Sequence, residues 1–335
     1  PTGMAVNNLY TKCINDNNNN IVVATIHKML FDIVYKVKQK PKLIIIDEFS
    51  MVDTLMFYKI LKWCKYYSCK LVCIADAEQL PPIAAGFPLY NLMQSTRIPV
   101  KHLTIIKRQE SEVLKNIILS FHQKNEVSLK HFDNKSMIFS NFSEKNIKNI
   151  ISNMKCDILN TKFITPQHKS EEGTISLNNV LQNIYNPKSQ RIPSLFKINY
   201  VFRINDLIIR NVNDYSNDSL YANGDLAYVR KYNNELIISY LSDHLKDQIV
   251  TPDKLYEEFS LGYALTIHRV QGSQYDNIVL CIADNHQYSW TSSESKKLLY
   301  TAISRSVKRC ICLGNPNLFL RAQNPQPSLY LSNLS

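Results

Sequence analysis

Two neighbouring carboxylates at the end of an apolar run carry the strongest chemical signal in this sequence. Residues 42–53 read KLIIIDEFSMVD, in which Asp47 and Glu48 follow a row of aliphatic side chains. An aspartate at the end of a buried strand can hold Mg²⁺ through water, and the following glutamate can orient or deprotonate an attacking water. A strand that simply stops at two solvated acids is the alternative, and the context DEFSMVD favours the catalytic interpretation.

A second polar segment follows the next apolar run. Residues 75–86 read ADAEQLPPIAAG, so that Asp76 and Gln79 come directly after KLVCI. A glutamine amide donates and accepts hydrogen bonds at once, which suits Gln79 to sense a γ-phosphate and to relay its presence to a second ligand. The position of this segment, one strand–helix–strand unit after the two acids, favours a functional origin over chance.

The glycines exclude one common partner of such a carboxylate pair from this sequence. A phosphate-binding loop of the pattern G-x-x-x-x-G-K-[ST] needs two glycines five positions apart. The seven glycines stand at positions 3, 86, 173, 224, 262, 272 and 314, and no two have this separation. Because residue 1 is proline, we expect the chain to begin inside a longer product, with the phosphate loop upstream.

The elements that must position these residues alternate between strands and helices. Residues 21–30 read as a strand running into a short helix, and residues 41–48 and 70–76 as strands buried on both faces of a parallel sheet. A helix from Asp53, a good N-cap, to about residue 67 joins the two buried strands. Since the carboxyl ends of parallel strands share one edge of the sheet, the acids of both strands are expected at one site.

The pattern changes twice in the rest of the chain. A helix is expected from Ser111, and further strands at 136–142 and 161–166. Residues 197–241 then read as short strands with Asn-Asn and Asn-Gly turns, which is typical of a small β module. The α/β pattern resumes after it, where Thr291 with Glu294 forms a candidate capping box for a helix through Arg305.

Bulk composition narrows the class of protein. Of the 335 residues, 39 are Lys or Arg and 28 are Asp or Glu, and the net charge of +11 favours a polyanionic partner such as nucleic acid. The eight cysteines have no framework or metal-ligand spacing and are expected to be reduced core residues. We expect an intracellular, soluble protein of the nucleus or cytoplasm, including that of an infected host cell, neither secreted nor membrane-bound.

The ordered motifs resemble those of the superfamily 1B DNA helicases, most closely the RecD-like branch, which is similar to Dda and Pif-type helicases. The segments that carry the resemblance are PTG, TIHKML, IIIDEFSMVD, ADAEQLPP, LTIIKRQ, YALTIHRVQGS and LLYTAISRS. The resemblance implies an α/β fold with two RecA-like P-loop NTPase lobes, ATP and Mg²⁺ as cofactors, and single-stranded DNA and the DNA fork as partners.

The resemblance also implies roles for the nucleotide-binding residues. Asp47 is expected to hold the metal and Glu48 to activate water, while Gln79 couples the nucleotide state to the lobes. Arg108 and Arg305 match the two arginines that reach the γ-phosphate from the second lobe. Such arginines stabilise the charge of the transition state. For Arg108 the alternative is an exposed charge before a helix.

A second group is expected to hold DNA. His27 has helix capping as an alternative role, and the motif with Thr266 also touches nucleotide through Gln271 and Gly272. Arg269 and Val270 stand where the family usually has Lys and Ser. The expected DNA contacts are Thr2, Gly3, Thr25, His27, Thr266, His268 and Arg269. Only about a dozen residues separate TIHKML from the acidic strand, so a strand-separating hairpin is expected to be short or missing.

We expect residues 1–97 to form an N-terminally truncated first lobe. The second lobe comprises 98–196 and 255–320, with an SH3-like β insertion at 197–254 and a loose tail at 321–335. The parent protein is expected to couple ATP hydrolysis to 5′→3′ translocation and duplex unwinding, alongside proteins of replication, repair or recombination. The chain alone is expected to be inactive. The alternatives are a non-catalytic DNA-binding helicase-like subunit without its own phosphate loop, and an RNA helicase of a viral replicase.

Overall fold

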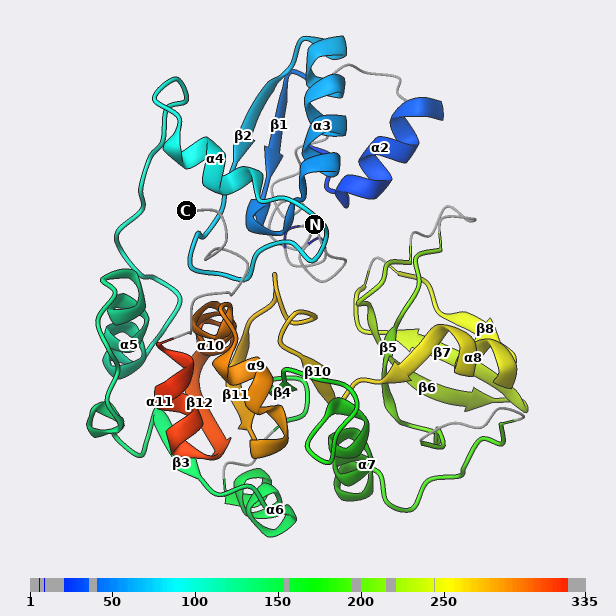
Figure 1. Ribbon diagram of the computed structural model, residues 1–335. Coiled ribbons are helices and arrows are strands. Elements are labelled where there is room, and N and C mark those ends of the chain that lie inside the picture. The colour runs from blue at the N-terminus through cyan, green and yellow to red at the C-terminus, as the bar shows by residue number, and fades with distance from the viewer. Residues whose placement is uncertain are drawn as a thin grey trace. The chain divides into compact units, whose positions relative to one another are not determined.

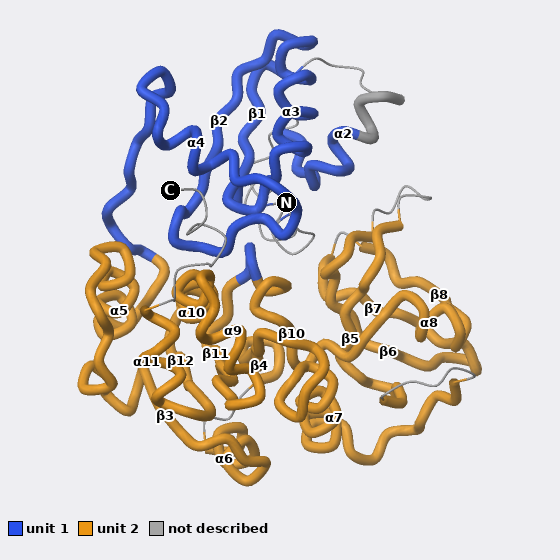
Figure 2. Tube along the Cα trace, in the orientation of Figure 1, with its two compact units in different colours: residues 1–107, 271–273 blue, residues 108–270, 274–335 orange. Residues whose placement is uncertain are grey.

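The computed structural model describes residues 6, 9, 21–35, 41–153, 157–194, 200–214, 221–243 and 245–324. The chain divides into two compact units, coloured separately in Figure 2. The first consists of Pro1–Lys107 with Gln271–Ser273, and the second of Arg108–Val270 with Gln274–Ser335. The first unit therefore extends past residue 97 as far as Lys107. Thr2 and Gly3, two of the expected DNA contacts, lie outside the described residues.

Within the described residues, the first unit is built around a two-stranded parallel sheet. Strand β1 (Leu43–Ile46) pairs with β2 (Lys70–Cys73), and helix α3 (Thr54–Tyr67) connects them. The other helical elements of this unit are α2 (Ile26–Tyr35), η1 (Phe49–Met51) and α4 (Pro88–Gln94). Figure 1 shows α3 running alongside the two strands, as a strand–helix–strand unit requires.

Helix α3 begins and ends where the sequence gives it caps. The Asp53 carboxylate accepts a hydrogen bond from the Met56 amide at 2.8 Å, which confirms Asp53 as the N-cap. The helix ends at Ser68, whose left-handed backbone (φ 54°) closes the last turn. Ile60 and Trp63 of this helix are buried together with Ile46 of β1, so this face of the sheet forms the core of the unit.

The opposite face of β1 departs from the prediction. Ile44 and Ile46 are buried, but Leu43 and Ile45 remain 48% and 59% exposed. The expectation of strands buried on both faces is therefore wrong for β1, because the described elements cover only the face that carries Ile44 and Ile46. It is wrong for β2 as well, since no residue of that strand is buried. The strand expected near residues 21–25 is not formed either, and Thr25 caps helix α2 instead.

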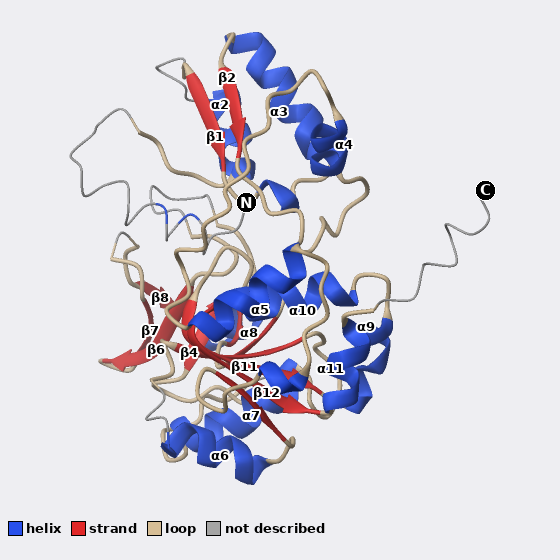
Figure 3. Ribbon diagram, turned by 90° about the vertical axis from the view of Figure 1, so that its left-hand side faces the viewer, coloured by secondary structure: helices blue, strands red, loops and turns tan. Residues whose placement is uncertain are grey.

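The second unit contains a five-stranded sheet in the order β10-β4-β11-β12-β3, with every pairing parallel. Its strands are β3 (Met137–Ser140), β4 (Thr161–Thr165), β10 (Ala264–Thr266), β11 (Tyr275–Ile282) and β12 (Ser306–Gly314). The helical elements around it are α5 (Glu112–His122), η2 (Leu129–His131), α6 (Glu144–Asn153), α7 (Thr174–Tyr185), η3 (Asp284–His286), α9 (Gln287–Thr291), α10 (Ser295–Ser304) and α11 (Pro316–Ala322). Figure 3 shows α5 and α10 on one side of the strands and α6 and α7 on the other.

An antiparallel β insertion interrupts this unit between α7 and β10. Its strands, in the order β8-β7-β6-β5-β9, are β5 (Leu207–Arg210), β6 (Leu226–Tyr232), β7 (Glu235–Tyr240), β8 (Gln248–Val250) and β9 (Phe259–Leu261). Helix α8 (Pro252–Glu258) lies between β8 and β9. The sheet continues past residue 254 because Phe259–Leu261 pairs with β5. Asn233 and Asn234, both with positive φ, form the tight turn predicted between β6 and β7.

The insertion shares one hydrophobic core with the five-stranded sheet. A single cluster of buried residues contains Phe163 of β4 and Ile311 of β12 together with Ile208 of β5 and Val229 of β6. A polar hub lies at the base of the insertion as well. The buried Asp206 carboxylate accepts hydrogen bonds from Gln182 of α7 and from Asn186, the C-cap of that helix, at 2.6 and 2.7 Å. The base of the insertion is therefore built into the second unit.

Some local predictions are resolved in the second unit. Ser111 caps α5 through its side chain, as predicted. The capping box at Thr291 is wrong, because Thr291 ends α9 and its hydroxyl donates to the Gln287 carbonyl, while Glu294 precedes α10 without a side-chain cap. The cysteines of the described part are free, as predicted, and Cys281 is fully buried.

No helix among the described residues has the length and apolar character to cross a membrane.

Candidate functional site

Asp47 and Glu48 stand at the carboxyl edge of the first unit's sheet, directly after β1. Asp47 Oδ1 accepts a hydrogen bond from the Glu48 amide at 2.9 Å. Glu48 has a left-handed backbone (φ 52°, ψ 43°), which is unfavourable for a residue with a side chain. The next amide, that of Phe49, donates to the carbonyl of Ile74 after β2 at 2.9 Å. Backbone bonds from the neighbouring strand thus hold Glu48 in a strained conformation, which is a feature of functional sites.

Gln79 lies at the same edge, three residues after Asp76. Asp76 accepts from the Glu78 amide at 3.0 Å and, through its carbonyl, from the Gln79 amide at 3.3 Å, which forms a tight turn after β2. The Gln79 side chain is only 5% exposed, and its Oε1 atom has no hydrogen-bond partner. A buried unpaired acceptor is costly and is expected to receive a donor from a ligand or water.

The segment that follows Gln79 is anchored to helix α3. Gly86 has φ 93°, and a Cβ atom there would lie 1.9 Å from Thr54 Oγ1, so only glycine fits this approach. The amide of Thr54 donates to the Ala85 carbonyl at 3.3 Å. The proline-containing loop is therefore fixed to the start of the helix that follows the two acids, which gives Gln79 and Glu48 a common support.

Gln271 and Gly272 belong to the same compact unit as these residues. Gln271–Ser273 groups with the first unit although the chain on either side belongs to the second. The Gln271 side-chain amide donates to the Leu80 carbonyl at 3.5 Å. Gly272 has φ 79°, a conformation that glycine adopts readily. The structure thus brings the predicted nucleotide-contacting residues Gln271 and Gly272 to the loop that begins at Gln79.

The two residues expected to bind DNA near the start of the described chain differ in availability. Thr25 is buried, and its hydroxyl accepts a hydrogen bond from the Lys28 amide at 3.1 Å as the cap of α2. His27 is exposed in the first turn of the same helix. Helix α2 is capped by Thr25 and not by His27, so the alternative role of His27 as a helix cap is wrong.

In the second unit, Arg108 is hydrogen bonded to the end of helix α10, beside Arg305. Arg108 Nη1 donates to the Ser304 carbonyl at 3.1 Å. Arg305 directly follows Ser304, and its guanidinium lies along the last helical turn, donating to the Thr301 carbonyl and to Ser304 Oγ. Arg305 is 1% exposed, whereas Arg108 is exposed. Arg108 is thus bonded to the residue that precedes Arg305, almost two hundred positions away in the chain.

Gln109 is a residue whose role sequence reasoning missed. Its buried amide donates to the carbonyls of Ser304 and Ser306 at 3.3 and 2.9 Å. The next amide, that of Glu110, donates to the Val307 carbonyl at 2.9 Å. The segment after Arg108 is therefore joined to the segment around Arg305. The motif KRQ contained the signal, because a glutamine beside a functional arginine is well suited to bridging backbone carbonyls.

The motif around Thr266 forms a turn after β10. Thr266 Oγ1 and its carbonyl both accept from the Arg269 amide, at 3.3 and 3.0 Å. His268 is half-buried, and burial lowers its pKa, with Glu294 opposing the effect. Arg269 is also half-buried, and its guanidinium reaches the β insertion. The turn thus places an imidazole with a lowered pKa next in sequence to an arginine whose guanidinium bonds the protein itself.

Few metal-ligating side chains stand together in the described part of the chain. Among the described residues, no group of three or more His, Cys, Asp or Glu side chains could hold a metal ion. Mg²⁺ commonly keeps several waters and binds through one or two carboxylates together with the phosphates of a nucleotide. The oxygen donors of Asp47 and the acceptor of Gln79 fit that coordination chemistry.

Two family models match the sequence. The model described as "AAA domain" matches residues 1–140, and the model described as "UvrD-like helicase C-terminal domain" matches residues 261–313. The first covers the acidic strand and Gln79, and the second covers the turn at Thr266 and the helix that ends before Arg305. The matched segments therefore carry all of the site residues predicted from the sequence.

Curated proteins similar to this chain include a DNA helicase and a subunit of the RecBCD enzyme. The ATP-dependent RecD2 DNA helicase of Deinococcus radiodurans is 26% identical over 82% of this chain and 36% of its own length. The RecD subunit of the RecBCD enzyme of Buchnera aphidicola is 23% identical over 83% of this chain and 55% of its own length. The chain thus spans between about a third and just over half of these relatives.

Solved structures share the fold. The Pif1 helicase from Bacteroides, solved with ADP-AlF3 and single-stranded DNA, has a TM-score of 0.55 and 16% identity over 94% of this chain and 78% of that one. The Pif1 helicase from Candida albicans has a TM-score of 0.53 and 16% identity over 93% of this chain and 82% of that one. At this level of identity the likeness concerns the fold, two RecA-like α/β lobes.

Proposed function

Since the chain is a RecD- and Pif-like member of the superfamily 1B helicases, we propose that the protein hydrolyses ATP with Mg²⁺. We further propose that it uses the energy to move 5′→3′ along single-stranded DNA and to unwind duplex DNA at a fork. The observation that carries the proposal is the strained Glu48 beside Asp47, at the edge where Gln79 carries an unpaired buried acceptor. The match to an ATP-dependent DNA helicase supports it.

The first unit supplies the groups for the hydrolysis step. Asp47 would hold Mg²⁺, and a bound Mg²⁺ would supply charge neutralisation at the phosphates of the nucleotide. Glu48 orients the attacking water and accepts its proton. Gln79 Oε1 accepts a hydrogen bond from this water or from a neighbouring ligand group, which satisfies the atom that is otherwise unpaired.

The second unit supplies positive charge. The guanidinium groups of Arg108 and Arg305 lie at the end of α10 and are the proposed γ-phosphate contacts. Arginines in this role stabilise charge in the transition state and contribute about 10³–10⁵ in rate in related enzymes. Gln109 holds the two segments together, so it acts as a positioning residue for both arginines.

Residues from both units are proposed to hold the DNA strand. His27 offers an exposed imidazole, while Thr266 and His268 offer the turn after β10. Thr2, Gly3 and Thr25 belong to the same proposed set by resemblance. The net charge of +11 predicts binding that weakens steeply with salt, because phosphate contacts release counterions.

The test is an ATPase and unwinding assay on the full-length protein. We expect ATP hydrolysis that depends on single-stranded DNA and unwinding of forks with a 5′ tail but not a 3′ tail. Binding of single-stranded DNA without ATP hydrolysis would instead identify a non-catalytic DNA-binding subunit. Stimulation by RNA alone would contradict the assignment to DNA.

A further inference from the structure

The β insertion touches the turn after β10 through one arginine. Arg269 Nη2 donates to three acceptors of the insertion: the Arg210 carbonyl at 2.9 Å, Asn211 Oδ1 at 3.0 Å and Asn223 Oδ1 at 2.9 Å. Arg210 is the last residue of β5, and Asn211 and Asn223 belong to the connection between β5 and β6. A planar guanidinium matches several fixed acceptors better than a flexible ammonium does. The side chain at the position where the family usually has Lys is therefore engaged by the protein itself.

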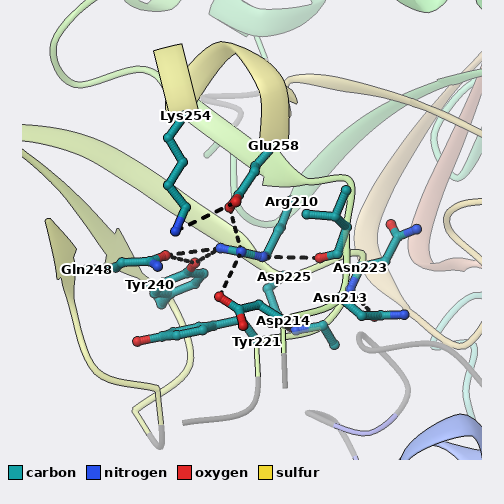
Figure 4. Close-up of polar contacts among 12 residues, drawn as sticks. Arg210, Asn213, Asp214, Tyr221, Asn223, Asp225, Tyr240, Gln248, Lys254 and Glu258 are labelled. Atoms are coloured by element: carbon teal, nitrogen blue, oxygen red, sulfur yellow. Dashed lines mark hydrogen bonds and ion pairs between the residues drawn. The ribbon is translucent and has the colours of Figure 1, made fainter. Parts of the chain in front are cut away.

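One acceptor of Arg269 is held rigidly, because Arg210 is the centre of a buried network (Figure 4). Arg210 is fully buried, and its Nη2 pairs with Glu258 at 2.5 Å and with Asp214 at 3.6 Å. Its Nη1 donates to Tyr240 Oη at 2.8 Å and to Gln248 Oε1 at 3.0 Å. A buried charge with this many partners cannot shift without large loss of stability.

Aromatic rings and backbone bonds complete the network. The Arg210 guanidinium lies over the rings of Tyr221 and Phe259, at 5.2 and 5.1 Å from their centroids. The Arg210 carbonyl that accepts from Arg269 also accepts from the Gly224 amide at 2.9 Å. The Asn223 amide donates to Asn213 Oδ1 at 2.7 Å. The described ends of the β5–β6 connection are thus folded against each other around the acceptors of Arg269.

The contact at Arg269 is separate from the base of the insertion. The base is fixed by the Asp206 hub, where Tyr263 Oη donates at 3.0 Å, and by the shared hydrophobic core. Asn178 of α7 also bonds both backbone groups of Ala264, at 2.8 and 2.9 Å. Loss of Arg269 should therefore free the β5–β6 connection without unfolding the insertion.

We propose that Arg269 is a positioning residue that fixes residues 211–214 and 221–225, the described ends of the β5–β6 connection, to the turn of Thr266 and His268, so that both present one continuous surface to single-stranded DNA. This role replaces the phosphate contact expected for Arg269 from the sequence, and its DNA-binding part rests on the proposed function. Arg269 acts through the protein acceptors on Arg210, Asn211 and Asn223, and the turn acts on the DNA.

The first test measures native-state hydrogen exchange without DNA or nucleotide. Arg269→Gln and Asn223→Ala should each accelerate exchange of the Gly224 amide by about tenfold, because the connection opens locally. The double variant should add little to either single change. Arg230→Gln is the matched control, since Arg230 lies in the same insertion and bonds Asn205 instead. Unchanged exchange in both Arg269→Gln and Asn223→Ala would overturn the proposal.

The second test measures the salt dependence of single-stranded DNA binding by the same variants. Arg269→Gln and Asn223→Ala should weaken binding to a similar extent, with an unchanged slope of log K against log salt. Loss of a direct phosphate contact would instead reduce the slope by about 0.7 in Arg269→Gln alone, and that result would overturn the positioning role. If the unmodified chain bound no single-stranded DNA, the proposed function would fail, while the exchange result would still decide whether Arg269 fixes the connection.

Discussion

The two parallel sheets of this molecule differ in how completely their strands are covered. Every residue of β4 is buried, whereas β1 alternates between buried and exposed positions. Leu43, Ile45, Val72 and Ile74 leave an open apolar face on the first sheet. Both strands are rich in aliphatic side chains, so the difference comes from the elements packed against them. An aliphatic run predicts a strand, but the burial of its second face depends on what else is present.

The two units also differ in how the side-chain amide of a buried glutamine is hydrogen bonded. Gln109 of the second unit donates to two backbone carbonyls, whereas Gln79 of the first unit has an unpaired Oε1. A satisfied buried amide stabilises the fold around it, and an unsatisfied one costs stability. The Gln109 amide therefore stabilises the fold of the second unit. The unpaired Oε1 of Gln79 is instead suited to accept a hydrogen bond from a ligand.

The largest effects of substitution are expected in β4. Phe163→Ala should lower the free energy of unfolding by about 3–5 kcal/mol, and Ile164→Ala should lower it by about 2–5 kcal/mol. Both side chains are fully buried although they point to opposite faces of the sheet. Denaturant unfolding monitored in the second unit measures both. If one of the two changes were nearly neutral, β4 would not be covered on both faces.

In β1 the effect should alternate instead. Ile46→Ala should cost about 2–4 kcal/mol, and the adjacent Ile45→Ala less than about 0.5 kcal/mol, because Ile45 is 59% exposed. The pair is its own control for aliphatic content and strand propensity. Equal costs at both positions in the chain of 335 residues would show that the open face is covered in solution.

A buried lysine makes the second unit sensitive to pH. Burial lowers the pKa of Lys162 to about 7, against an opposing effect of Asp157, and its Nζ donates to the Gly262 carbonyl. The unfolded chain keeps the usual pKa of 10.5 and binds more protons above pH 7, so the free energy of unfolding rises with pH between about 7 and 10.5. Lys162→Met should remove this rise, which is at most about 1.4 kcal/mol per pH unit.

The measurement is denaturant unfolding of both proteins at pH 7, 8 and 9. The difference between the variant and the unmodified chain should change steadily over this range, since the other titrating groups are common to both. A difference that did not depend on pH would show that Lys162 stays charged in the fold.

The smallest effect is expected at the β6–β7 turn. Asn234→Gly should stabilise the insertion by up to about 1 kcal/mol, because Asn234 has φ 66° and glycine adopts that conformation without a steric cost. Thermal unfolding detects a change of this size. Destabilisation would show that the Asn234 side chain makes a contact that matters more than backbone strain.

Short sequence patterns predicted where helices, strands and turns begin and end better than they predicted which faces of these elements are buried. The Asp53 cap, the Asn233–Asn234 turn and the acidic strand end at Asp47 depend on a few adjacent residues, and these predictions are confirmed. The open face of β1 was not predictable, because burial depends on segments distant in sequence. Thr291 failed as a capping residue because a short helix, α9, already uses it at its end.

The residues of the candidate site likewise fall into those that the sequence indicated and those whose contacts only the structure shows. The residue types at Asp47, Glu48 and Gln79 indicated their chemistry from sequence, since each follows a strand of one parallel sheet. The joining of Arg108 to the helix end before Arg305 depended on family resemblance, because the two are distant in the chain. The bridging amide of Gln109 and the protein acceptors of Arg269 became visible only in the folded chain.

The central claim is that Glu48 activates water for ATP hydrolysis, and one variant tests it most directly. In the full-length protein, Glu48→Gln should lower the DNA-stimulated ATPase rate by at least about 10²-fold, because the amide cannot accept the proton. Nucleotide binding should persist, and Glu112→Gln, on the exposed start of α5, should leave the rate unchanged. An ATPase rate in Glu48→Gln close to that of the unmodified protein would contradict the account.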